Sequence, residues 1–504
     1  MGVDLEVGRN GERQPLLAGK SSKSAGSSSR GKRREKRVRG SVLYTVFCTI
    51  VVALGPITFG FSVGYSSPTQ QKLTEDLGLS LSEFSMYGSL VNAGAMAGAI
   101  LSGRIADRFG RKGALVIASI PHIAGWILNA LAMVSSFSLS IQHHEVSFLF
   151  QNVASLYIAR LLVGFGVGVI SFTVPMYIAE ISPKNLRGSL GAINQLSVTT
   201  GIFLSYLGGL VLPWRTLALV GVAPCSVLLV GLFFIPESPR WLAKMGIEDT
   251  LITSLQALRG KDSDISSEVS EIKDAVDISY KQEANVRMSD LCKKTIFLPL
   301  TITIGLLLLQ QISGINAILF YSSAIFHSAG FSSSNLASLS LALLQVVMTG
   351  VAAVLMDRAG RRLLLMVSGA GMAVSCFLVG FAFYLQQHMD ATSHFAPFVG
   401  NLALISLLVY ITSFALGMGP IPWIIMSEVL PSHIKGLGGS VATLVNWTFS
   451  WLVTMSFNFL LNWSSTGSFA LFAGMCAFTV LFVAVLVPET RGRTLEEIEA
   501  LFQE

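Results

Sequence analysis

The chain has 504 residues, of which 52% are hydrophobic and only 13% are charged, and its mean hydropathy is +0.63. Soluble domains carry about 25% charged residues, so this composition excludes a soluble protein of this length. The formal net charge of +6 is uneven, because nine basic residues gather between Lys20 and Arg39. Residues 1–40 are therefore predicted to form a disordered basic tail in the cytosol, in preference to a specific lipid or nucleic-acid site.

Apolar runs of about 20 residues, the length that crosses a bilayer as a helix, recur along the rest of the chain. We predict a transmembrane helix at each of twelve runs: 43–65, 84–103, 113–135, 153–178, 188–210, 214–235, 295–324, 334–356, 363–386, 402–428, 437–460 and 467–487. Basic residues concentrate in the loops after the second, fourth, eighth and tenth runs. By the positive-inside rule, both termini and the segment 236–294 lie in the cytosol. Ser238-Pro239 and the Leu-rich stretch 250–259 predict short amphipathic helices in that segment.

The chain repeats itself with a period of about 250 residues. Asp107 and Asp357 are 250 residues apart, Glu180 and Glu428 are 248 apart, and the motifs PESPRW and PETRGR are 252 apart. Three independent motifs with one period predict two related six-helix halves, 41–235 and 295–487, joined by the linker 236–294 and followed by a cytosolic tail, 488–504. Parallel halves with a binding site between them are typical of alternating-access carriers.

The repeated cytosolic loops combine acids with bases near helix ends. One interpretation is that they set topology and folding alone; however, bases without partner acids would suffice for orientation. We therefore predict a cytosolic latch of charge-assisted hydrogen bonds that holds the two halves together in one state of the carrier. Its candidate residues are Asp107, Arg108, Arg111, Glu180, Arg187, Asp357, Arg361, Glu428 and Lys435.

Amide side chains lie in the middle of the seventh apolar run, in the sequence QQISGIN. On an unbroken helix Gln311 and Asn316 do not share a face, so we expect Gly314 to relax the backbone and redirect Asn316. Polar groups at membrane depth are functional candidates, although any single amide could instead join helices. Further candidates lie in the fifth, tenth and eleventh runs. These are Gln195, Trp423, Asn446 and Trp447, with Gly419, Pro420 and Pro422 in a tenth run that cannot form a straight helix.

The chemistry of these residues is neutral. Amides both donate and accept, so they match hydroxyl groups, and indoles offer flat apolar surfaces to a ring. The set favours an uncharged polyhydroxylated solute such as a hexose over a cationic drug, which would favour a buried acid. No nucleophile–base or metal-ligand pattern is present, so we predict no enzyme, no metal and no cofactor.

The motifs GRIADRFGRK, PMYIAEISPKNLRG, PESPRWL, QQISGINAILFY, GPIPW and PETRGRTLEE resemble the sugar porter family of the major facilitator superfamily, from about residue 41 to 500. Within it, FALGMGPIPWIIMSE and VALGPITFGFSVGYSSPTQ are most similar to the early-response-to-dehydration branch of plant monosaccharide transporters, whose members include vacuolar glucose exporters. The resemblance implies an all-α membrane protein of the major facilitator fold, with twelve transmembrane helices in two pseudo-symmetric halves.

The resemblance also assigns roles to residues. It implies sugar-binding side chains at Gln195, Gln310, Gln311, Asn316, Trp423, Asn446 and Trp447, and a gate on the non-cytosolic side at Phe320 and Tyr321. The chain departs from the family at Ser62, where proton-coupled members often carry aspartate. Arg160, which tunes that acid in symporters, is retained here for coupling or as a structural counter-ion. Proton-coupled and facilitative transport both stay open.

Glu12, Leu16 and Leu17 fit an acidic dileucine signal of the kind that sorting adaptors read for the vacuole. We therefore expect a multi-pass protein of the vacuolar membrane, with the plasma membrane as the alternative. Its expected function is export of a monosaccharide, with glucose foremost, from vacuole to cytosol. A non-transporting sugar sensor and a polyspecific drug–proton antiporter are the alternatives. The expected partners are the sugar, protons if transport is coupled, the bilayer and a sorting adaptor, but no nucleic acid.

Overall fold

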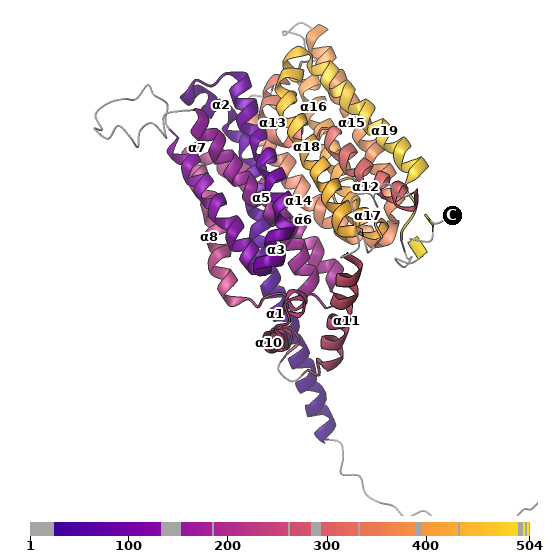
Figure 1. The fold of residues 1–504 in the computed structure, drawn as a ribbon. Coiled ribbons are helices and arrows are strands. Elements are labelled where there is room, and N and C mark those ends of the chain that lie inside the picture. The colour runs from indigo at the N-terminus through magenta and orange to yellow at the C-terminus, as the bar shows by residue number, and fades with distance from the viewer. Residues whose placement is uncertain are drawn as a thin grey trace, which may run out of the picture.

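The computed structural model describes residues 25–132, 153–183, 186–260, 263–283, 294–330, 333–388, 396–431, 434–491, 497–498 and 501–502. Figure 1 shows two helical bundles side by side, with the linker helices at one end. We call this the linker end and the opposite one the far end. The prediction of an all-α membrane protein in two bundles joined by a helical linker is confirmed.

The N-terminal half contains α1 (Ala25–Gly64), α2 (Ser66–Leu77), α3 (Leu81–Leu131), α5 (Val153–Ile181), α6 (Arg187–Val211), α7 (Trp214–Val220), α8 (Val222–Gly231) and η2 (Leu232–Phe234). The linker contains α9 (Pro239–Lys244), α10 (Glu248–Arg259) and α11 (Ser266–Glu283). The C-terminal half contains α12 (Lys294–Ile312), α13 (Ile315–Ser328), α14 (Ser334–Ala359), α15 (Arg361–His388), α16 (Ala396–Leu416), α17 (Ile421–Val429), α18 (Lys435–Trp463) and α19 (Ser465–Leu486).

The first helix starts earlier than the sequence predicts. Disorder was expected through residue 40, whereas α1 extends back to Ala25. Adding residues to an existing helix is far easier than nucleating a new one, and Arg, Lys and Glu are good helix formers. The transmembrane segment therefore continues into the basic region. The dileucine residues Glu12, Leu16 and Leu17 lie outside the described residues.

Ten helical stretches of the described chain are long and apolar enough to cross a membrane. The longest, α3, has 51 residues, which is about 75 Å of helix and more than twice the thickness of the hydrocarbon core. Gly110, with φ of 80°, breaks α3 between the second and third predicted runs. α6 is a further 25-residue helix outside these ten stretches. Twelve spans therefore remains a prediction of the sequence.

Helices pack closely both within each half and between the halves. Inside the N-terminal half, α3 crosses α5 at glycines: a Cβ added at Gly94 would lie 2.3 Å from the Leu161 carbonyl oxygen, and one at Gly164 would lie 2.1 Å from that of Val91. Small residues allow such close approach in membrane bundles. Between the halves, α3 packs along α18, α6 along α14, and α2 against α13.

Candidate functional site

The seventh predicted span breaks in its middle, as the sequence predicts. α12 ends at Ile312 and α13 begins at Ile315, and Gly314 between them has φ of 97°. Any other residue would be strained there, and its Cβ would lie 2.8 Å from the ring of Phe472. The break redirects Asn316, whose Nδ2 donates to Oε1 of Gln311 over 2.7 Å.

The tenth predicted span breaks at the same depth. α16 ends at Leu416 and α17 begins at Ile421, so backbone carbonyls between them lose their helical partners. Nε2 of Gln310 donates to two of these, the carbonyl oxygens of Met418 at 2.5 Å and Gly419 at 2.9 Å. One amide therefore joins the break in α12–α13 to the break in α16–α17, and it satisfies groups that would otherwise be costly in a membrane.

Gln310 has no hydrogen-bonding capacity left. Both of its N–H groups are used on α16–α17, and its Oε1 accepts from Nε2 of Gln311 at 3.4 Å and from Nδ2 of Asn446 at 3.2 Å. Asn446 also donates to the carbonyl oxygen of Leu307 at 3.1 Å, which uses its second N–H. These two amides hold α12, α16–α17 and α18 together.

Other polar groups of the site retain unused capacity. Nε2 of Gln311 makes one of its two possible hydrogen bonds. Asn316 uses both of its N–H groups, the second on Oγ of Ser450 at 2.6 Å. The Oδ1 of Asn316 accepts from no donor among the described residues. The indole N–H of Trp447 is buried without an acceptor there. Trp447 also packs on Phe59 of the other half, with ring centroids 5.7 Å apart. The side of the site that carries these unused hydrogen-bonding groups of Gln311, Asn316 and Trp447 therefore lies toward the interface between the halves.

Two predicted sugar-binding residues stand apart from the amide network. Gln195 is half-buried on α6, and within the described chain no hydrogen bond links it to the amides of α12, α13 or α18. Trp423 is half-buried on α17, two residues after Ile421. The network therefore combines Gln310, Gln311, Asn316 and Asn446 from the C-terminal half.

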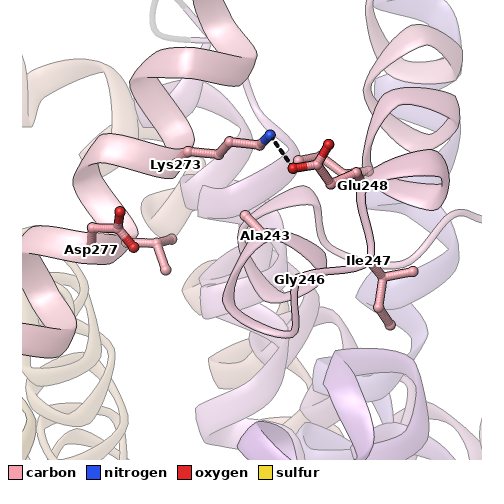
Figure 2. A pocket seen from close by; sticks show the side chains of 8 residues that line it. Ala243, Gly246, Ile247, Glu248, Lys273 and Asp277 are labelled. Atoms are coloured by element: carbon pink, nitrogen blue, oxygen red, sulfur yellow. Dashed lines mark hydrogen bonds and ion pairs between the residues drawn. The ribbon is translucent and has the colours of Figure 1, made fainter.

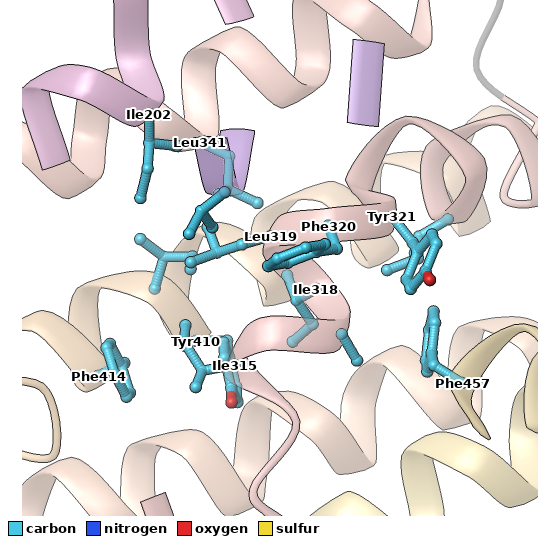
Figure 3. Packing of buried hydrophobic residues seen from close by; sticks show 14 of the residues in the cluster. Ile202, Ile315, Ile318, Leu319, Phe320, Tyr321, Leu341, Tyr410, Phe414 and Phe457 are labelled. Carbon is cyan, nitrogen blue, oxygen red and sulfur yellow. The ribbon is translucent and has the colours of Figure 1, made fainter. Parts of the chain in front are cut away.

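The predicted gate lies between the halves at the far end. Phe320 and Tyr321 are fully buried, and the hydroxyl of Tyr321 donates to the Thr454 carbonyl oxygen at 2.9 Å. Figure 3 shows Tyr321 beside Phe457, with the rings stacked at 5.6 Å. Gly88 of α3 makes room for this tyrosine, since a Cβ there would lie 3.0 Å from its hydroxyl oxygen.

Sequence reasoning missed a set of hydroxyl contacts that joins the halves beside this gate. Oγ of Ser67 lies 2.7 Å from Oγ of Ser322 and 3.0 Å from Oγ of Ser323, and it also accepts the backbone N–H of Ser323. The signal was present as a repeat, because the tripeptide YSS occurs at 65–67 and again at 321–323. Two copies of one tripeptide, one from each half, therefore meet at the interface between the halves.

At the linker end, each predicted ion pair lies within one half. Arg111 makes a bidentate bond to Glu180, at 2.7 and 2.8 Å, and the two side chains are 8% and 9% exposed. Its repeat counterpart Arg361 lies 3.6 Å from Glu428. Asp107 binds Arg111 at 3.6 Å and Lys244 of the linker at 3.1 Å. The predicted latch between the halves is thus not among these pairs.

The remaining latch candidates supply no ion pair between the halves in the described part of the chain. The guanidinium of Arg108 lies over the neighbouring Phe109 ring, with its carbon 5.8 Å from the centroid. The side chains of Arg187, Asp357 and Lys435 lie outside the described part of the structure.

A second feature of the linker end was missed, the glutamate of PES and PET. Glu237 accepts the backbone N–H groups of Arg111 and Lys112, each at 3.0 Å, and Glu489 accepts those of Arg361 and Arg362 at 3.0 and 3.1 Å. Each carboxylate caps a helix that starts after a glycine with positive φ. Burial raises the pKa of Glu237. Burial acts in the same direction on Glu489, but backbone N–H bonds outweigh it and lower its pKa.

The linker contains a small hollow of about 150 Å³. Figure 2 shows Lys273 of α11 reaching Glu248 at the start of α10, where Nζ and Oε1 are 2.5 Å apart. Gly246, Ile247 and Asp277 also line it. These residues belong to the linker, so this hollow is separate from the amide network.

Two related bundles that meet around broken helices and buried amides define a membrane carrier of the alternating-access class. The family described as "Sugar (and other) transporter" matches residues 48–502, and the chain belongs to that family. The chain is 52% identical to Sugar transporter ERD6-like 6 of Arabidopsis thaliana, over 99% of both chains. It is 44% identical to Sugar transporter ERD6-like 16 of the same plant, over 93% of this chain and 92% of that one.

Solved structures agree with this assignment. The inward open xylose transporter XylE from E. coli matches with a TM-score of 0.74 and 27% identity, covering 91% of this chain and all of that one (100%). The proton:xylose symporter XylE bound to 6-bromo-6-deoxy-D-glucose matches with a TM-score of 0.73 and 28% identity, covering 91% and 99%. The resemblance to sugar porters, to their early-response-to-dehydration branch and to the major facilitator fold is thereby confirmed.

Proposed function

We propose that this protein transports a monosaccharide, with glucose as the first candidate, by alternating access between the two halves, and that it catalyses no chemical reaction. The observation that carries the proposal is the unused hydrogen-bonding capacity of Gln311, Asn316 and Trp447 on the face toward the interface. A neutral donor and acceptor set of this kind matches sugar hydroxyls. A relative of the same fold is described with a glucose derivative bound, which supports a hexose as substrate.

We propose further that transport is facilitative. By the resemblance, Ser62 stands where proton-coupled members of the family often carry aspartate, and its hydroxyl donates to the Thr58 carbonyl oxygen. His122 is the one histidine in the membrane-spanning part that the structure describes away from a helix end. Its Nδ1 bonds the Val163 carbonyl oxygen, and its Nε2 accepts from the indole of Trp126 at 3.0 Å. A second proton on His122 would face the Trp126 N–H, so the neutral ring is favoured.

Labelled glucose uptake into liposomes containing the purified chain tests both proposals. We expect saturable uptake and counterflow at the same rate with and without an imposed pH gradient. Uptake that requires the gradient would establish proton coupling and overturn the facilitative proposal. Retained glucose binding without uptake would favour a sensor, and competition by cationic drugs would favour an antiporter.

We propose the vacuolar membrane as the location and export to the cytosol as the direction, on the basis of the dileucine signal at Glu12, Leu16 and Leu17. A sorting adaptor that binds this signal would be the partner. A fluorescent fusion carrying Leu16→Ala and Leu17→Ala should move from the vacuole to the plasma membrane. Retention of that variant on the vacuole would contradict the role of the signal.

A further inference from the structure

Arg160 is a buried cation without a counter-ion. Its side chain on α5 is 0% exposed, and a guanidinium stays charged in proteins. Nη2 donates to Oγ of Ser66 at 3.1 Å, Nη1 makes a long contact of 3.5 Å with the Ser62 carbonyl oxygen, and Nε has no acceptor. Throughout the described chain, no carboxylate forms an ion pair with it.

Aromatic rings surround the guanidinium but do not satisfy it. Its central carbon lies 4.2 Å from the centroid of Tyr87, 4.9 Å from that of Tyr65 and 5.8 Å from that of Trp126. Ring faces attract a cation, yet the N–H groups at the edge of the guanidinium still need acceptors.

The tyrosine hydroxyls of this cage donate their protons elsewhere. Tyr87 donates to Oδ1 of Asn129 at 2.8 Å, Nδ2 of Asn129 donates to the hydroxyl of Tyr65 at 3.2 Å, and Tyr65 donates to the Trp214 carbonyl oxygen at 2.7 Å. The cage therefore offers Arg160 ring faces and neutral oxygens, among them the hydroxyl oxygen of Tyr87, but no negative charge. A buried charge that is not balanced is strongly unfavourable.

We propose that a small monovalent anion, chloride in the cell, binds at the Nε edge of Arg160. One negative charge balances the guanidinium, and the enclosed cage favours a small ion. Ser66 accepts from Arg160 and so retains its own hydroxyl proton to donate to the anion. Ser62 contributes no charge, which leaves this function to an ion from solution.

The site adjoins the far-end gate. Ser66 contacts Arg160, and the next residue, Ser67, makes the hydrogen bonds to Ser322 and Ser323 that join the halves. Bound anion fixes the segment that carries both serines. Anion binding accordingly stabilises the conformation in which the far end is closed.

Halide quenching of tryptophan fluorescence tests binding directly and needs no sugar. The full chain in nanodiscs is titrated with sodium bromide or iodide against sodium gluconate at constant ionic strength. A heavy halide at Arg160 lies close to Trp126, which is 1% exposed and out of reach of collisional quenching. We expect a saturable component that chloride displaces and that is missing from Trp126→Phe. Quenching that is only linear, and equal in both proteins, overturns the proposal.

A substitution at Ser62 gives a matched pair of variants that leaves the cage intact. Ser62→Asp places a carboxylate beside Arg160 and should abolish the saturable quenching, whereas Ser62→Asn, of similar size but uncharged, should retain it. If the two variants quench alike, the charge-balance argument is wrong. The result is independent of the transport proposal: a chain that transports glucose without binding halide refutes the anion site alone, and a chain that binds halide without transporting refutes the proposed function alone.

Discussion

Gln310 and Gln311 are neighbours in the sequence, but their hydrogen bonds give them different roles. All the bonds of Gln310 are used within the protein, whereas Gln311 keeps a donor for a ligand. We predict that Gln311→Ala raises the KM for glucose about tenfold, because a lost sugar hydrogen bond is worth about 1 kcal/mol and leaves a polar partner unpaired. Counterflow in liposomes measures this change. An unchanged KM would remove Gln311 from the site.

Gln310→Ala is the matched variant and should behave differently. It leaves the carbonyl oxygens of Met418 and Gly419 without their donor, and each unsatisfied buried group costs about 1–3 kcal/mol. We expect Gln310→Ala to lower the unfolding temperature in detergent, and to lower it by more than Gln311→Ala does. If Gln310→Ala unfolds like the wild type and only its KM rises, Gln310 binds sugar directly.

Glu489 gives the linker end a pH-dependent cap. Its folded-state pKa lies below the ordinary glutamate value, so it contributes stability above that ordinary value, and this contribution is lost as the pH falls through the folded pKa. Glu489→Gln should therefore lower the unfolding temperature at neutral pH, and the difference from wild type should shrink in acid. Thermal unfolding of both proteins across this range checks the trend, and a constant difference would contradict it.

At the scale of an element, the helix that follows each repeated loop depends on one glycine and one carboxylate. Gly110 has φ of 80°, and a Cβ there would lie 2.4 Å from Oε2 of Glu237. We predict that Gly110→Ala lowers the free energy of unfolding by about 1–3 kcal/mol, through backbone strain and loss of the cap. Thermal unfolding in detergent measures the loss. Gly191→Ala is the control, since a Cβ meets nothing within 4 Å there, and a similar loss in both variants would refute this explanation.

The sequence predicts helices and their breaks well where these depend on residues close together in the chain. Apolar length marks the spans, and the strained position of Gly314 follows from the need to bring Gln311 and Asn316 together. It predicts contacts between distant segments less well. The pairing of Gln310 with Gly419 depends on two breaks lying at one depth. The contact of Ser67 with Ser322 involves no charge, and the repeated tripeptide YSS marks both segments without showing that they meet.

At the scale of the whole molecule, the described contacts fit a carrier closed at its far end. Hydroxyl and amide bonds join the halves there, including Asn92 to Thr454 and Asn458 to Ser85, both at 2.9 Å. At the linker end, Arg111 and Arg361 each bind an acid of their own half. Alternating access requires one end to open as the other closes, which explains why a latch between the halves need not form in this conformation.

The closed far end can be locked covalently. Oγ atoms of Ser67 and Ser322 lie 2.7 Å apart, so cysteines at both positions bring their sulfur atoms close enough to oxidise. We predict that Ser67→Cys with Ser322→Cys loses nearly all glucose counterflow after oxidation and regains it after reduction, because the far end can no longer open. The single variants are the controls, and they also report any reaction of the five native cysteines. Of these, Cys48, Cys225, Cys376 and Cys476 are buried, and Cys292 lies outside the described residues. A cross-linked protein that still transports at the wild-type rate would show that these serines do not belong to the gate.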